Sequence, residues 1–107
     1  MGAGGGGQER VAGYLVVQFG GLAANVTKLA VAEDRRRLGL GTALLSEALA
    51  LAQKRRAACV RLHVETERKG MTLRAQALYK RMGFVEDTTI QDYYSKGRHA
   101  YRMMLEF

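Results

Sequence analysis

Two glycines and a cluster of arginines lie at the junction of an expected strand and an expected helix. Arg36, Gly39 and Gly41 are spaced as Arg-x-x-Gly-x-Gly, and an apolar helical repeat follows directly. The first N–H groups of a helix lack partners within it, and the helix dipole adds positive charge there. Because glycine lets a backbone approach a ligand closely, this junction is suited to pyrophosphate. The pattern lacks the Gly-Lys-Ser/Thr of a Walker loop and the third glycine of a dinucleotide fingerprint.

Two further side chains are able to move a proton. Tyr79 lies on a second expected helix, and a phenol with a pKa of about 10 can donate a proton. His63 lies on an expected strand, and an imidazole that titrates near about pH 6.5 can accept a proton. Ordinary packing is the alternative interpretation of each. The lone Cys59 has no Asp or His arrangement around it in the sequence, which argues against a covalent acyl-enzyme.

The elements that must position these residues follow from the apolar periodicity. Helical spacing after Gly41 predicts a helix that ends near Arg55–Arg56, and a second helix is expected over residues 72–82, with Gly83 as its C-cap. Strands are expected over residues 11–19, 25–32, 58–64, 84–90 and 98–107, with a turn over 92–97. The strand, helix and strand from residue 25 to residue 64 predict a crossover with parallel strands.

Composition bounds the class of protein. The chain has 107 residues, a formal net charge of +7 and one cysteine, which predicts a flexible Gly-rich tail over residues 1–10 and one domain over 11–107. The apolar stretches are too short for a membrane span, and a single cysteine provides neither a disulfide framework nor a Cys-rich zinc site. We therefore expect no membrane and no metal, and a reducing, cytoplasmic setting. The basic clusters have no nucleic-acid-binding motif beside them, so solvated surface or a small anionic ligand is favoured over nucleic acid.

Two linked motifs identify a family. The stretch from Leu29 to Leu45 resembles the acetyl-coenzyme A signature of the GNAT superfamily of N-acetyltransferases, and Ala75 to Phe84 resembles its second hallmark, Ala-x-x-Leu-Tyr followed by Gly-Phe. The stretch from Tyr93 to Met103 is similar to the ending of the protein N-terminal acetyltransferase branch. The resemblance covers residues 11–107 and implies an α/β (α+β) fold with a mixed, mostly antiparallel sheet and two helices.

The resemblance also implies residue roles. Tyr79 would protonate the leaving thiolate, and His63 would be the general base, although Asn25 stands where some members pair that His with a Tyr. Tyr93 and Tyr94 would line the entrance for an acceptor peptide. The residues expected to bind acetyl-coenzyme A are Leu29, Val31, Arg36, Arg37, Leu38, Gly39, Leu40, Gly41, Thr42, Thr72 and Tyr79. Thr72 stands where many members have Asn.

The front of the chain departs from the family pattern. Members carry a first strand, two helices and a second strand before the hairpin of residues 11–32, so we expect the fold to lack these elements. The expected function is direct acetyl transfer from acetyl-coenzyme A to a primary amine, most like a protein N-terminal α-amine, with an auxiliary subunit as a conceivable partner. The alternatives are a small-molecule amine acetyltransferase, a truncated inactive fragment and a basic nucleic-acid-binding module.

Overall fold

Five strands and two helices make up the part of the chain that a computed structural model describes, residues 13–32 and 39–107. The elements follow in the order β1 (Gly13–Gly20), β2 (Ala23–Val31), α1 (Leu40–Lys54), β3 (Cys59–Glu65), α2 (Gly70–Arg81), β4 (Val85–Ser95) and β5 (Arg98–Glu106). Both expected helices and all five expected strands are present. Neither helix is long and apolar enough to cross a membrane.

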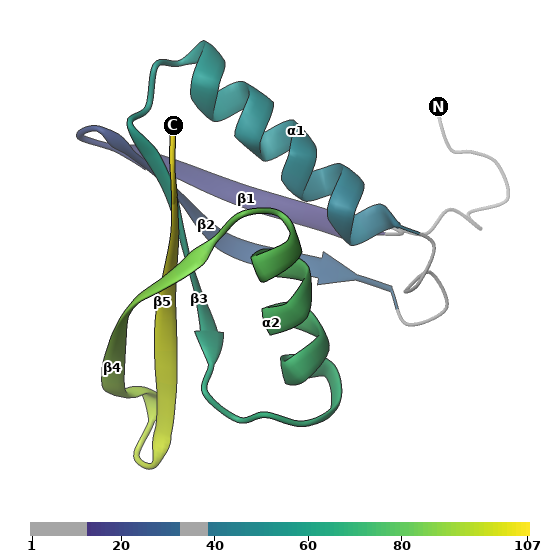
Figure 1. Cartoon of the computed structure of the whole chain (residues 1–107), viewed down its shortest axis with the longest axis vertical. Helices are drawn as coiled ribbons and strands as arrows, with labels where there is room; N and C mark the ends of the chain where they lie inside the picture. The colour runs from purple at the N-terminus through teal and green to yellow at the C-terminus, as the bar shows by residue number, and fades with distance from the viewer. Residues whose placement is uncertain (1–12, 33–38) are drawn as a thin grey trace, which may run out of the picture.

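The strands form one mixed sheet in the order β1-β2-β3-β5-β4. The β2–β3 pair is parallel and the other three pairs are antiparallel, so the expected fold class is confirmed. Both helices lie against the same face of the sheet (Figure 1). Alternation along β3 gives that face Val60, Leu62 and Val64, which are buried in the core, and gives the other face Arg61 and His63.

The two parallel strands separate after their first few residues. Ala23, Ala24 and Asn25 of β2 pair with Cys59, Val60 and Arg61 of β3, and the register given for these two strands ends there. Beyond this point β2 continues to Val31 alongside β1, whereas β3 continues to Glu65 alongside β5. The sheet is therefore split in its middle, with separate strands on either side of the opening (Figure 1).

Strand β4 corrects the expected turn over residues 92–97. It extends to Ser95, and the turn is confined to Lys96 and Gly97. Asp92 takes a left-handed backbone conformation at φ 55°, and the pairing with β5 is irregular between Ile90 and Ser95. Asp tolerates this conformation better than most residues, so the residue that looked like a turn former produces an irregularity within a strand. The consequence is that Tyr93 and Tyr94 lie on β4.

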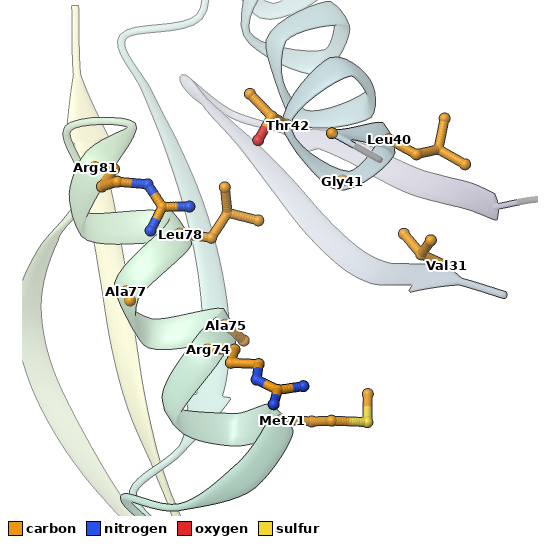
Figure 2. A pocket seen from close by; sticks show the side chains of 11 residues that line it. Val31, Leu40, Gly41, Thr42, Met71, Arg74, Ala75, Ala77, Leu78 and Arg81 are labelled. Carbon is orange, nitrogen blue, oxygen red and sulfur yellow. The ribbon is translucent and has the colours of Figure 1, made fainter. Parts of the chain in front are cut away.

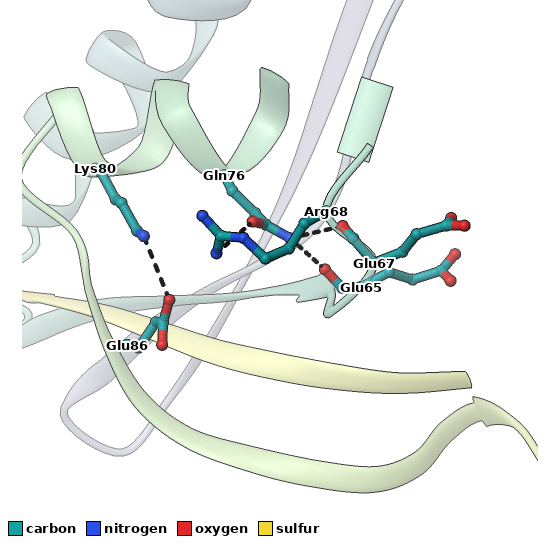
Figure 3. A network of polar contacts seen from close by, with 6 residues as sticks. All are labelled: Glu65, Glu67, Arg68, Gln76, Lys80 and Glu86. Carbon is teal, nitrogen blue, oxygen red and sulfur yellow. Dashed lines mark hydrogen bonds and ion pairs between the residues drawn. The ribbon is translucent and has the colours of Figure 1, made fainter. Parts of the chain in front are cut away.

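Gln76 fastens helix α2 to the loop that follows β3 (Figure 3). Its side chain is 2% exposed, and its Nε2 donates to the carbonyl oxygens of Glu65 at 2.8 Å and Glu67 at 3.0 Å. Its Oε1 accepts a long bond from Arg68 at 3.5 Å. A buried amide needs such partners, and here one side chain satisfies the carbonyl of the last residue of β3 and one carbonyl of the loop that follows. This contact sets the position of α2 relative to β3.

Replacement of Gln76 tests this fastening. We expect Gln76→Leu to lower the free energy of unfolding by about 2 kcal/mol, because the shape of the side chain is roughly kept while two carbonyls lose their donor. Urea denaturation followed by circular dichroism measures the change. The matched control is Gln53→Leu at an exposed position of α1, which should stay within about 0.5 kcal/mol of wild type. Equal effects of the two substitutions would contradict a special role for Gln76.

Candidate active site

The backbone at the start of α1 leaves room for a ligand to come close to it. Gly39 takes a left-handed conformation at φ 76°, which glycine adopts without strain. The N–H of Ala43 donates to the carbonyl of Gly39 at 3.0 Å, so the N–H groups before it are those that open a helix. A Cβ added at Gly41 would lie 3.5 Å from Cδ2 of Leu78 and 3.9 Å from Cγ2 of Val31. Its absence keeps space free between α1, β2 and α2.

That space is a cavity of about 490 Å³ between the start of α1 and the near face of α2 (Figure 2). Apolar side chains and the backbone of the glycine junction form most of its wall, and two guanidinium groups extend from α2 beside it. We call it the junction cavity. It is lined by Val31, Gly39, Leu40, Gly41, Thr42, Met71, Arg74, Ala75, Ala77, Leu78 and Arg81.

A second cavity, of about 330 Å³, lies where β2 and β3 separate, and we call it the split cavity. It is lined by Tyr14, Val26, Thr27, Lys28, Leu29, Ala30, Leu62, His63 and Tyr79. Tyr79 comes from α2 on the helix side of the sheet, whereas His63 belongs to the alternation that faces the other side. The split thus joins the two faces. Leu78 borders one cavity and Tyr79 the other, so the cavities adjoin along α2.

Tyr79 is fixed by burial and by contact with an aromatic ring. It is 8% exposed and meets the ring of Phe84 edge-on, with 6.2 Å between the ring centres. Burial raises the pKa of the Tyr79 hydroxyl above its ordinary value, because the phenolate would lose hydration. The hydroxyl therefore keeps its proton throughout the neutral range. It is suited to donating to a developing thiolate and unsuited to acting as a base.

His63 is held as a neutral imidazole. Its ring stacks on Tyr93, with 4.5 Å between the centres and 10° between the planes. Burial lowers the pKa of His63, and the positive charge of Arg102, its register partner on β5, lowers it further. Arg102 itself is paired with Asp87. One ring nitrogen is consequently unprotonated at neutral pH, which is the state that a general base needs.

The two tyrosines of β4 form an aromatic wall beside His63. The Tyr94 ring stands edge-on to Tyr93, with 4.9 Å between centres, and the Arg98 guanidinium lies 5.5 Å from the centre of the Tyr94 ring. Burial, with the neighbouring Tyr93 and Glu65, raises the pKa of Tyr94 to about 12. Arg98 also pairs with the Glu65 carboxylate and lowers its pKa. Glu65 is therefore engaged by Arg98, and His63 is oriented by its stacking on Tyr93.

The structure brings together most of the residues that the sequence singled out. Leu29, His63 and Tyr79 line the split cavity, and Val31 with Gly39 to Thr42 lines the junction cavity. Thr72 is half-buried on α2 and is not among the lining residues of either cavity. Asn25 lies beside Arg61 in the register, two residues before His63. The predictions for Arg36, Arg37 and Leu38 fall outside the described residues.

Several lining residues were not predicted from the sequence, and four of them have large polar or charged side chains. Tyr14 and Lys28 border the split cavity, and Arg74 and Arg81 border the junction cavity. The sequence did contain a signal for the two arginines. Arg74, Leu78 and Arg81 are spaced i, i+4 and i+7, which places them on one face of a helix. Within residues 13–32 and 39–107, no cluster of three His, Cys, Asp or Glu side chains is placed to hold a metal ion.

Residues 6–86 match the family described as the acetyltransferase (GNAT) domain. The chain belongs to the GNAT acetyltransferase family. The match covers β1, β2, α1, β3 and α2 and ends at the start of β4.

Individual relatives cover most of this chain but only part of their own length. An N-alpha-acetyltransferase of Sulfurisphaera tokodaii is 39% identical over 80 residues, which are 74% of this chain and 46% of that protein. The ribosomal-protein-S18-alanine N-acetyltransferase from Escherichia coli is 32% identical with a TM-score of 0.77, over 89% of this chain and 61% of that one. Nourseothricin acetyltransferase is 30% identical with a TM-score of 0.80, over 89% and 57%. The GNAT chain described here thus spans about half the length of the curated relative.

Proposed function

We propose that the protein transfers acetyl from acetyl-coenzyme A to a primary amine. The observation that carries the proposal is the split cavity, where a protonated Tyr79 and a neutral His63 line one space that opens between two separating strands. The junction cavity beside it offers the start of α1 to the phosphates of the cofactor. A strand-like pantetheine arm would pair with the backbone of β2 near Leu29, beyond the point where the register with β3 ends.

The chemistry follows from the two groups in the split cavity. The amine nitrogen attacks the acetyl carbon, a C–N bond forms, and the C–S bond of the thioester breaks. His63 takes the proton that the amine loses, directly or through a water molecule. The Tyr79 hydroxyl donates its proton to the departing thiolate. No bond forms between the acetyl group and the protein. Cys59 agrees with this, because it is buried and is the first residue of β3, four residues before His63.

A protein N-terminal α-amine is the acceptor that we favour. An α-amine has a pKa of about 7.7–8.0 against about 10.4 for a lysine side chain, so far more of it is neutral at pH 7 and a weak base suffices. The aromatic wall of Tyr93 and Tyr94 stands beside His63 on β4, and both rings are more than 40% exposed, as an entrance for a peptide requires. The N-terminal acetyltransferases among the relatives support this choice.

A small-molecule amine is the second candidate. The relative named nourseothricin acetyltransferase, at 30% identity, favours it. Such an acceptor would use the same cofactor residues and would have little need of Tyr93 and Tyr94. The two candidates therefore differ in what the aromatic wall contributes to turnover.

Acetyl transfer and its acceptor are tested together. We expect acetyl-coenzyme A at about 100 times its Kd to stabilise the protein by about 2.7 kcal/mol in a thermal-shift titration. Mass spectrometry of a peptide panel should then show acetylated N-termini. The double variant Tyr93→Ala, Tyr94→Ala should lose at least about tenfold in kcat/KM for peptides, because the wall beside His63 is removed.

The outcomes separate the candidates. An absence of any thermal shift at millimolar acetyl-coenzyme A would overturn the acetyltransferase proposal. Unchanged turnover of a small amine by the Tyr93→Ala, Tyr94→Ala variant, with no peptide acetylated by wild type, would favour the small-molecule acceptor. The control is Phe107→Ala after β5, whose side chain is also about half exposed but which borders neither cavity and is not part of the aromatic wall.

A further inference from the structure

We infer that Arg74 and Arg81 of α2 bind the phosphate groups of coenzyme A from the side of the junction cavity opposite α1. This inference rests on the proposed function and names the residues by which the site would select its cofactor. Both arginines line the junction cavity, yet neither belongs to the glycine motif or to the Ala-x-x-Leu-Tyr motif. Their guanidinium groups extend from α2 on its α1-facing side (Figure 2).

The spacing of the two arginines gives them one face of the helix. They are seven residues apart, which is about two turns and about 10 Å along the axis. Leu78 lies between them on the same face and forms part of the apolar wall. A ligand that lies along this face would meet a positive charge at each end and an apolar surface between them.

Neither arginine forms an ion pair with a carboxylate in the described part of the chain. Elsewhere on α2, or directly before it, basic side chains have carboxylate partners: Lys69 pairs with Glu67 at 3.3 Å and Lys80 with Glu86 at 3.4 Å. Across residues 13–32 and 39–107, no such ion pair involves Arg74 or Arg81. Two like charges beside an apolar cavity repel each other, and an anionic ligand relieves that repulsion.

Phosphate is the anion that fits this arrangement. The guanidinium fork donates two parallel bonds to phosphate oxygens, and arginine loses less hydration than lysine when a ligand covers it. Coenzyme A carries a pyrophosphate and a separate ribose phosphate, which are more anionic groups than the start of one helix can hold. The arginines of α2 supply the additional cations. They therefore favour coenzyme A thioesters over pantetheine thioesters, which share the reactive end but carry no phosphate.

The test compares ligands that share the pantetheine arm and carry three, two or no phosphate groups. Isothermal titration at fixed salt measures Kd for coenzyme A, 3′-dephospho-coenzyme A and pantetheine with wild type and with the double variant Arg74→Gln, Arg81→Gln. We expect the variant to bind coenzyme A about 50-fold more weakly, since each lost charged hydrogen bond costs on the order of tenfold. Its affinity for pantetheine should stay within about twofold of wild type. Dephospho-coenzyme A reports how much of the loss belongs to the ribose phosphate.

A second double variant serves as the control for net charge. Lys69→Gln with Lys80→Gln also removes two positive charges, at the two ends of α2 and at side chains that pair with carboxylates. It should bind coenzyme A within about threefold of wild type. If both double variants lose similar affinity for coenzyme A, the arginines act only through the net charge of the protein, and the inference is overturned.

Two further results would also overturn it, in ways that can be told apart. If wild type binds coenzyme A and the Arg74→Gln, Arg81→Gln variant binds it equally well, the inference fails and the proposed function stands. If the variant loses affinity for pantetheine and coenzyme A equally, the arginines maintain the shape of the cavity and do not bind phosphate. If wild type binds no coenzyme A at millimolar concentration, the proposed function and the inference fail together.

Discussion

Tyr79→Phe is expected to lower kcat for acetyl transfer by about 100-fold while leaving the Kd for acetyl-coenzyme A within about threefold. General acid catalysis contributes about 10²–10⁴-fold, and this substitution removes the proton that would reach the thiolate. The ring of Tyr79 packs against Phe84 and is almost fully buried, so phenylalanine keeps the contact. Single-turnover kinetics with saturating acetyl-coenzyme A measures the effect.

The matched control is Tyr101→Phe on β5. Tyr101 also packs against the core, but it borders neither cavity. Removal of its hydroxyl should change kcat by less than about twofold. If Tyr79→Phe retains more than a third of wild-type kcat, the thiolate does not depend on this hydroxyl and the assignment is wrong.

His63→Asn is expected to change the shape of the pH profile as well as the rate. For an α-amine acceptor, log kcat/KM falls with slope 1 as pH drops below about 8, because the amine becomes protonated. Below the pKa of His63, which burial and Arg102 hold under its ordinary value of 6.5, the base is lost too and the slope becomes 2. The variant should lose about 100-fold near neutral pH and should keep slope 1 throughout.

His99→Asn is the control for this profile. His99 is the second histidine of the chain, and its Nδ1 accepts a bond from the Asp92 N–H at 2.9 Å, which an asparagine oxygen can also accept. Its profile should keep the change from slope 1 to slope 2. The same break in His63→Asn as in wild type would exclude His63 as the base.

Local patterns in the sequence predicted the elements well. Helical spacing located α1 to within two residues at its C-terminal end, and alternation located β3 to within one residue. Leu29, Val31 and the residues from Gly39 to Thr42 lie beside cavities because their strand–glycine–helix order forces that neighbourhood. The family assignment from the two motifs is confirmed by the match over residues 6–86.

What local patterns missed depends on contacts between distant segments. Asp92 resembles a turn residue, and only its placement opposite β5 shows that it interrupts a strand. His63 stacks on Tyr93, which is thirty positions away in the chain, so the local sequence around either residue does not predict the contact. Arg74 and Arg81 line the junction cavity because α2 packs opposite the start of α1, and the sequence of α2 alone does not show that arrangement. The roles of the lining residues stay predictions.

The separation of β2 from β3 leaves two internal sheet edges in the ligand-free molecule. From Val26 to Ala30 and from Leu62 to Glu65, each strand is paired on one side and faces an opening on the other. Unpaired edges exchange amide hydrogens readily and invite pairing with other chains. A pantetheine arm in this opening would act as a missing strand. Any molecule that pairs with these two edges would be expected to slow both proteolysis and self-association of this chain.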